Sequence, residues 1–572
     1  MRLNLMAFTA VAPCLALLCL AAPAAVADAT RDAAEIAAID AAQVCGPAGT
    51  VQSAANADPV AGMVMVDGFG KATWPVDATP EAQAWFDHGV RLRWAFEHSE
   101  SVRAFRKARQ LDPNCGMCAW GEAWALGPNL NGGGNDDASQ AAALKAAREA
   151  RRLARDATST QKRMIDALVQ RYSGRKDSRE RRFARAMDRI ATRNPDDLLI
   201  SAATADAWLL TDYDWWNKDG TAKAAGVTRA MNLLEHSLRV DADDPGAIHL
   251  YIHLTEWSDD PHKAIPYGEK LARLAPGASH LVHMPSHTFY RVGRYKDAMN
   301  SNVEAVALDR RYDSLARPQG GVKGMPLHAH NIHFGMGGAL MAGGADRGVE
   351  LADWFLATYG DMGPTAVWRS IQANNAYALY GRFADPAKVA SIAEPAAGKY
   401  LLRVSWHYMR GEAAARAGDA SAVRAEAEAI KTLISATTFV GPMQDNQKGF
   451  VQLSQHVLEG RAAMIDGDAD AAVAAFSAAA AIQALGDGEG GDPPIIWYPT
   501  RRSLAAALLA KGDAAGAKGK IEELLKDWPS DPYSYFVLAE AEAKLGNTQA
   551  AADARAKSRV EWIGGTMNLK LA

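Results

Sequence analysis

The sequence predicts an all-α fold, a solenoid in which antiparallel helix pairs stack into a superhelix with essentially no β-sheet. Three observations lead to this fold class. Small residues and turn glycines recur with a 34-residue period over most of residues 80–572. Alanine-rich stretches, which favour helix, fill the repeating segments. The 572-residue chain is 49% hydrophobic and 22% charged, which is typical of a folded globular protein.

The repeat is clearest at residues 82–115. Positions 8, 20, 24, 27 and 32 of this stretch are Gly89, Ser101, Phe105, Ala108 and Pro113. The same register fits 245–278, 279–312, 404–437, 453–486, 498–531 and 532–565. The pattern resembles the tetratricopeptide repeat (TPR), which implies a TPR-type α-solenoid. This resemblance implies a fold and no particular activity, because function lies in the side chains that the repeats display.

The chain divides into five expected segments. In order they are a signal peptide at 1–27, an irregular N-terminal extension at 28–78, N-terminal TPR-like helices at 79–200, central histidine-rich TPR-like repeats at 201–390, and C-terminal TPR repeats at 391–572. Glycine-rich runs interrupt the repeats and predict loops between them.

The first 27 residues have the composition of a secretory signal. Arg2 precedes an apolar run over 5–24, and the Ala-Val-Ala sequence at 25–27 offers the small residues that signal peptidase requires. We therefore expect a periplasmic or secreted protein. The alternative is an uncleaved N-terminal anchor, the one case in which the chain would meet a membrane. A net charge of −4 without a basic patch argues against a nucleic-acid partner.

Three cysteines follow the predicted cleavage site, at Cys45, Cys115 and Cys118. In an oxidising compartment the C-x-x-C pair favours a small disulfide between Cys115 and Cys118. One of the two could instead pair with Cys45, or the motif could be half of a metal site or a redox dithiol. The zinc-ribbon reading is the weaker one, because the sequence contains no second C-x-x-C.

Most of the 14 histidines lie between residues 249 and 333, in the central repeats. His249 and His253 are spaced i, i+4 and share one helical face, as do His283 and His287. The two pairs are one repeat apart, so both occupy positions 5 and 9 of the first helix of their repeat. This spacing predicts that the repeats present the two pairs side by side.

A third group of histidines follows after an insertion. If Gly343 marks the turn of the next repeat, that repeat begins at residue 329, and His330 and His333 take positions 2 and 5. Position 2 of the preceding repeat is His280, which shares the face of the histidines at positions 5 and 9. The first helices of TPR arrays line the concave surface, so all three groups are expected to meet there.

The spacing predicts a transition-metal site on the concave face. Imidazole nitrogen binds Zn, Cu and Fe(II), and histidines at i, i+4 reach one ion with little distortion of the helix. Glu256, at position 12, could add a carboxylate. The expected ligands are His249, His253, Glu256, His280, His283, His287, His330 and His333, with Asp206 as an additional candidate. The alternatives are hydrogen-bonded core histidines, copies left by repeat duplication, and an anion pocket.

Two functions fit these features. The first is a metal-dependent enzyme, an oxidoreductase or a hydrolase, that acts on a small molecule or peptide in the concave groove. The alternative is a non-catalytic TPR scaffold that binds a peptide or protein partner there. The sequence contains no G-x-S-x-G, H-E-x-x-H or Walker A motif, so the common hydrolase and nucleotide-binding classes have no support.

A closer resemblance rests on three segments. The H-x-x-H-M-P-S-H sequence at 280–287, the N-C-G-M-C-A-W-G sequence at 114–121 and the H-N-I-H-F sequence at 330–334 are similar to those of exported bacterial TPR proteins. Such proteins are expected to have a glutamate and an extra tyrosine near Pro493, where this chain has Asp492 and Ile495. The resemblance implies an exported TPR protein and carries over no activity.

Overall fold

The structure is a computed structural model. It describes residues 60, 62–130, 134–217, 219–363, 366–439, 444–485, 493–494 and 496–572. The predicted signal peptide, most of the N-terminal extension, Cys45, Asp492 and Ile495 lie outside the described residues. Within the described ranges the chain forms helices, and its β-structure is a single bridge between Trp216 and Ala222. None of the helices in these ranges has the length and apolar character needed to cross a membrane.

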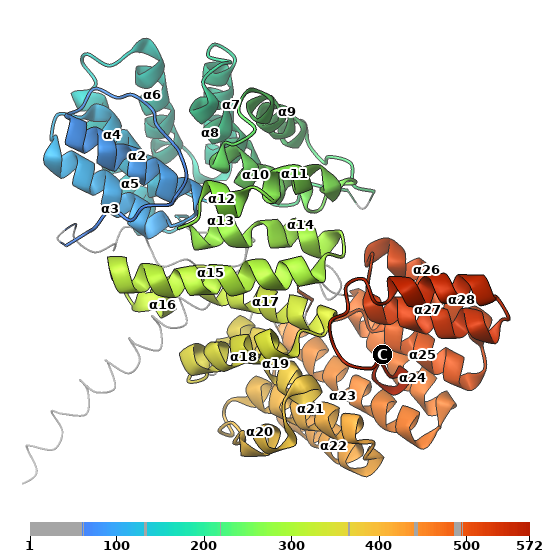
Figure 1. The fold of residues 1–572 in the computed structure, drawn as a ribbon. Helices are drawn as coiled ribbons and strands as arrows, with labels where there is room; N and C mark the ends of the chain where they lie inside the picture. The colour runs from blue at the N-terminus through green and yellow to red at the C-terminus, as the bar shows by residue number, and fades with distance from the viewer. Residues whose placement is uncertain are drawn as a thin grey trace, which may run out of the picture.

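The N-terminal helices stack as pairs in chain order (Figure 1). They are α2 (Pro80–Trp94), α3 (His98–Leu111), α4 (Gly116–Ala125), α5 (Asp137–Leu153), α6 (Ser159–Ser173), the 3₁₀ turn η2 (Lys176–Ser178), α7 (Arg179–Ala191), α8 (Leu198–Leu209) and α9 (Ala225–Val240). A phenyl ring explains the small residues of the first repeat. A Cβ added at Gly89 would lie 2.8 Å from the ring of Phe105, so helix α2 can approach α3 only without a side chain there.

The central helices carry the histidines. They are α10 (Pro245–Thr255), η3 (Pro261–Ala264), α11 (Ile265–Gly268), α12 (Leu271–Leu274), α13 (Ser279–His283), α14 (Pro285–Arg291), α15 (Tyr295–Ala316), α16 (Gly321–Gly324), α17 (His328–Ala342), α18 (Ala345–Tyr359), α19 (Val367–Phe383) and α20 (Pro386–Ser391). Prolines break two of the expected helices, because proline lacks the N–H that an α-helix needs. Pro261 and Pro266 divide the second helix of one repeat, and Pro285 separates α13 from α14.

The C-terminal repeats are the most regular. Their helices are α21 (Tyr400–Ala417), α22 (Ala420–Ala436), α23 (Gln444–Asp466), α24 (Ala469–Leu485), α25 (Arg501–Lys511), α26 (Ala514–Asp527), α27 (Pro532–Lys544), α28 (Thr548–Lys557) and the 3₁₀ turn η4 (Leu569–Leu571). Gly512 ends α25 with a φ of 97°, a conformation that favours glycine. The next residue, Asp513, then caps α26 by accepting a hydrogen bond from Gly516 N at 2.8 Å. A glycine followed by a capping side chain thus makes the tight turn within a pair.

The segment after α28 turns back along the solenoid. Figure 1 shows it running from α28 toward α17 and then to the C mark near α25. Ile563 N donates to Ala342 O at the end of α17, at 2.8 Å. Further on, Arg461 donates to Ala572 O at 2.6 Å, and Arg382 donates to Leu571 O at 3.3 Å. This tail therefore ties the C-terminal repeats to a helix of the histidine-rich repeats.

Candidate metal centre

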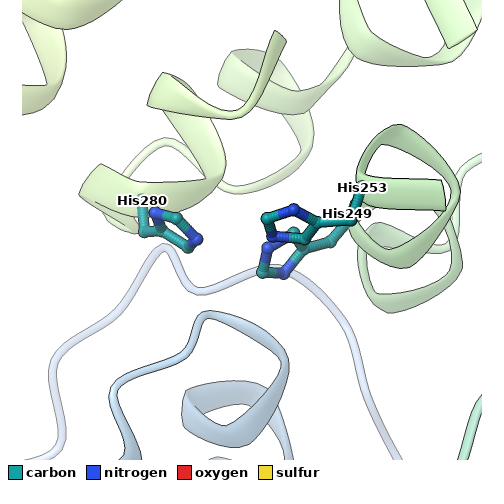
Figure 2. Close-up of side chains that lie close together, drawn as sticks. All are labelled: His249, His253 and His280. Carbon is teal, nitrogen blue, oxygen red and sulfur yellow. The ribbon is translucent and has the colours of Figure 1, made fainter. Parts of the chain in front are cut away.

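Six histidines of the central repeats gather into two groups of three. The first triad is His249, His253 and His280, and the second triad is His283, His287 and His330. In each triad the ring nitrogens that could bind an ion all lie within 4.8 Å of one another. All six side chains are buried. Figure 2 shows the first triad, with His249 and His253 on one helix and His280 approaching from another.

In the first triad, a hydrogen bond at Nδ1 orients the ring of His249. His249 Nδ1 lies 2.5 Å from the carbonyl oxygen of Trp94, which can only accept, so Nδ1 carries the proton and Nε2 keeps its lone pair. His253 Nδ1 lies 3.6 Å from Glu256 Oε1. Nε2 of both histidines is buried without a hydrogen-bond partner, and so are both ring nitrogens of His280. Buried nitrogens without partners are costly, and a bound cation would satisfy them.

The second triad has the same arrangement. His283 Nδ1 lies 2.6 Å from Asn302 Oδ1. The amide of Asn302 donates to Ala298 O at 2.7 Å, which fixes its oxygen as the acceptor for His283. His287 Nδ1 donates to Glu256 Oε2 at 2.5 Å. Both Nδ1 atoms therefore carry a proton, and the Nε2 atoms of the two rings point toward each other.

The Nε2 atoms of the second triad face one another. The Nε2 atoms of His283 and His287 are 3.0 Å apart, and those of His287 and His330 are 3.4 Å apart. At such distances two ring nitrogens either share one proton or bind one cation. Two nitrogens that bind one ion at about 2.0–2.1 Å are separated by about 2.8–3.4 Å in octahedral or tetrahedral geometry. The spacing in the second triad matches that of nitrogens around one ion.

Glu256 lies between the triads and contacts one histidine of each. Its two carboxylate oxygens face the Nδ1 atoms of His253 and His287, on the side of the rings away from the Nε2 atoms. Burial alone would raise the pKa of this carboxyl, but His287 and His253 outweigh burial and lower it. The structure therefore places Glu256 as a negatively charged hydrogen-bond partner of the histidines.

A phenyl ring packs against each triad. The ring centroid of Phe96 lies 4.1, 5.5 and 5.4 Å from those of His249, His253 and His280. The ring centroid of Phe334 lies 4.5–4.9 Å from each imidazole of the second triad. Phe96 belongs to the turn between α2 and α3 and has a φ of 57°, which few residues other than glycine adopt. This turn covers the first triad, so the site is buried and not open on a concave surface.

Burial favours the neutral form of five of the six triad imidazoles. It lowers the pKa of His249, His280, His283 and His330 well below the usual value, and their mutual proximity lowers it further. The pKa of His253 is also lowered by burial, although Glu256 opposes the shift. Neutral imidazole is the form that binds metal ions.

Besides Glu256, two of the predicted ligands lie outside both triads. His333 is buried in α17, where burial and then Arg369 lower its pKa to about 3. Asp206 of α8 forms a buried ion pair with Arg93 of α2, at 3.0 Å, which neutralises its charge. The other predicted pair, Cys115 and Cys118, forms a disulfide at the start of α4.

Four groups of the site were missed from the sequence. They are the carbonyl of Trp94, the rings of Phe96 and Phe334, and the side chain of Asn302. Phe334 follows the last predicted histidine directly, which was a usable signal. Trp94 is the last residue of α2 and Phe96 lies in the turn after it, about 150 residues before the first triad, and no sequence pattern connects them to it.

No family model and no curated protein matches the chain. Among solved structures, the human IFIT1 dimer with m7Gppp-AAAA is 14% identical, with 85% of this chain and 96% of that chain covered and a TM-score of 0.31. Yeast Tom70 is 12% identical, with 84% and 90% covered and a TM-score of 0.27. The P58(IPK) TPR domain is 12% identical, with 82% and 99% covered and a TM-score of 0.22.

These TM-scores are low, so the fold assignment rests on the helix pairs and the repeat register of the chain itself. Stacked antiparallel pairs, turn glycines one repeat apart and close packing at repeat position 8 are all present. The chain is a TPR-type α-solenoid whose central repeats bring six buried histidines together as two triads.

Proposed function

We propose that this chain is a transition-metal protein in which each histidine triad binds one ion. The observation that carries the proposal is the shared orientation of the rings. In His249, His283 and His287, Nδ1 donates to an oxygen acceptor and Nε2 is turned toward the other histidines. Metal-binding histidines typically have this arrangement, because the outer hydrogen bond fixes the tautomer and the ring direction.

The ligand atoms of the two triads limit which metals can bind. Six imidazole nitrogens suit Zn, Cu or Fe, whereas Mg and Ca prefer oxygen ligands. Non-haem Fe(II) usually binds two histidines and a carboxylate. Glu256 is directed at the Nδ1 atoms instead of the space between the Nε2 atoms, so the all-nitrogen sets favour Cu and Zn over Fe.

The surroundings favour an oxidoreductase that acts on a small molecule over a hydrolase. A metal-dependent hydrolase needs a water molecule on the ion and space for the substrate beside it. Here the triads are buried and a phenyl ring packs on each. Electron transfer does not require the substrate to bind the ion. The turn that covers the first triad also counts against an open peptide-binding groove at this place, and so against a scaffold function centred there.

Export remains part of the proposal. The apolar segment and small residues within 1–27 support secretion to the periplasm or medium. N-terminal sequencing of the mature protein should then begin near Asp28. An intact Met1 in soluble cytoplasmic protein would contradict export without bearing on the metal site.

Element analysis of the purified protein tests the proposal. Wild-type protein should bind two ions per chain after incubation with Cu or Zn and removal of the excess. His253→Ala and His287→Ala should each lose one of the two. His262→Ala is a matched control, because His262 lies in the same histidine-rich segment but is mostly exposed, and it should keep both ions. Equal metal contents in all four proteins would contradict the proposal, and so would wild-type protein that binds none.

The enzymatic part has its own test. Metal-loaded protein should oxidise small-molecule electron donors with consumption of oxygen, and His253→Ala and His287→Ala should not. Hydrolysis of ester or peptide substrates by the zinc-loaded protein, without any oxidation by the copper-loaded form, would show that the hydrolase class is correct instead.

A further inference from the structure

The first triad offers a metal ion three neutral nitrogen ligands. His249, His253 and His280 are 0, 4 and 0% exposed. Nε2 of His249 and of His253 has no hydrogen-bond partner, and neither ring nitrogen of His280 has one. The three ring centroids lie 4.9, 4.9 and 6.3 Å apart, so the imidazoles form a compact triangle. An ion bound within this triangle receives three nitrogens.

Phe96 limits the coordination number. Its ring centroid lies 4.1–5.5 Å from the three imidazole centroids, about as far from each as they lie from one another. The phenyl ring is therefore the fourth vertex of a tetrahedron of rings, on one side of the triangle. A positive φ at a residue with a large side chain is strained, so it persists only because the surrounding packing holds Phe96 in this place. The ring excludes water and anions from that side of the ion.

The charge of the surroundings limits the charge of the ion. Glu256 is shared between the first triad and His287. Asp206 is paired with Arg93, whose charge cancels that of the carboxylate. The first triad is thus compensated by less than one full negative charge. The cost of burying an ion rises with the square of its charge, so a divalent ion here costs about four times as much as a monovalent ion.

These observations point to one ion. Zn²⁺ normally takes four ligands, and Cu²⁺ prefers four or more in a tetragonal arrangement. Cu⁺ has a filled d shell and is stable with three nitrogen ligands and a single positive charge. We infer that the first triad is a copper(I) site, selected by its three imidazoles, its phenyl ring and its weakly charged surroundings. This inference rests on the proposed function, and it names the metal of one of the two sites.

The experiment isolates the first triad in the full chain. His283→Ala together with His330→Ala removes two ligands of the second triad. The apo form of this variant is titrated anaerobically with Cu⁺ against bicinchoninate, and separately with Zn²⁺ against a chromophoric zinc chelator. We expect one tightly bound Cu⁺ and a far weaker affinity for Zn²⁺. X-ray absorption of the copper form should show three nitrogen neighbours.

Phe96 variants test the cause of the selectivity. Phe96→Gly suits the positive φ and removes the ring, so the ion can gain a fourth ligand. In this variant the Zn²⁺ affinity should rise by about tenfold or more, while the Cu⁺ affinity changes little. Phe96→Leu keeps an apolar side chain there and should retain the selectivity. Circular dichroism checks that both variants are folded. If the glycine variant is misfolded, the metal content and the selectivity of the Phe96→Leu protein provide the test.

The possible results distinguish a failure of the copper(I) inference from a failure of the proposed metal binding. Zn²⁺ that binds the isolated first triad as tightly as Cu⁺, or copper with four or more light-atom neighbours, would overturn the copper(I) inference and leave metal binding intact. Unchanged Zn²⁺ affinity in folded Phe96→Gly would overturn it as well. If neither metal binds the isolated triad, or if adding His249→Ala changes neither affinity, the proposed metal site itself fails.

Discussion

Replacing Glu256 with glutamine tests the carboxylate between the two triads. One carboxylate oxygen accepts a hydrogen bond from His287 Nδ1 at 2.5 Å, and the other lies 3.6 Å from His253 Nδ1. A glutamine side chain has one oxygen and an NH₂ group, so it can accept from only one of the two imidazoles. The other ring would face a donor and lose the contact that fixes its orientation, and both would lose the negative charge.

The magnitude follows from these contacts. A hydrogen bond to a charged group contributes about 1.5–3 kcal/mol, and removing a group that orients a metal-binding histidine lowers metal affinity about 10–100-fold. The contact with His287 is much shorter than the contact with His253. We therefore expect a loss of about 10–100-fold at the second triad and at most about tenfold at the first.

The assay is a chelator competition titration of Glu256→Gln in two backgrounds, each with one triad disabled by alanine substitutions. Glu269→Gln serves as the control, because Glu269 is a half-exposed carboxylate of the same repeat that pairs with Arg294. Unchanged affinities at both triads would refute the reasoning. A larger loss at the first triad than at the second would show that the distances do not rank the two contacts.

Four further predictions concern the fold and its charges. His287→Ala should lose metal yet keep its helical circular dichroism, because each repeat is held by its neighbours; extensive loss of helix would contradict this. Burial and then two nearby carboxylates raise the pKa of Glu97 from the usual 4.5 to about 8. The folded protein therefore loses stability as the pH rises from 4.5 to 8, and Glu97→Gln should be more stable than wild type by up to about 5 kcal/mol at pH 9 and equal at pH 4 in denaturant titrations. Arg461→Ala removes a buried ion-pair partner and the donor to the C-terminal tail, so denaturant unfolding should show a loss of about 3–5 kcal/mol; a loss under 1 kcal/mol would contradict the role of the pair. Thiol titration of unfolded, unreduced protein should find the cysteines of the C-x-x-C motif unreactive, and free thiols there would contradict the disulfide.

The fold was predictable because its constraints are local. Gly460 and Phe476 occupy positions 8 and 24 of their repeat, and a Cβ added at the glycine would lie 2.5 Å from the phenyl ring. Such pairs recur at fixed spacing and can be recognised in the sequence. The proline breaks in the central repeats were visible too, but the register alone does not show that Pro285 ends α13 between His283 and His287. Both helices keep one direction, so the two histidines remain neighbours.

The site was predictable only as far as the repeats determine it. The histidine-bearing helices follow from the 34-residue register, and all six triad histidines were expected. The turn that covers the first triad was not expected, because it depends on a hydrogen bond from His249 to the carbonyl of Trp94, 155 residues away in the sequence. The curvature of the whole solenoid brings these segments together, and repeat spacing contains no information about that contact. The predicted site on the concave face did not include a covering turn for the same reason.

The repeat register shows which positions supply the histidines of each triad. Each triad combines positions 5 and 9 of one repeat with position 2 of the next. His333 occupies position 5 of the third histidine-bearing repeat, but position 9 there is Gly337. A Cβ at Gly337 would lie 2.2 Å from the ring of Pro493, so a histidine does not fit at that position. The pattern therefore stops after two triads.

The same register explains why the two triads are oriented by different groups. Position 24 of the second repeat is Asn302, which accepts from the histidine at position 5 of that repeat, His283. Position 24 of the first repeat is Gly268, which has no side chain to offer His249. The carbonyl of Trp94 takes that role, and the turn that supplies it also places Phe96 on the first triad. The two sites share their ligand positions and a phenyl ring but differ in the groups that orient them. Glu256 lies closer to His287 than to His253, so the first triad receives less negative charge, which is why we assign copper(I) to it alone.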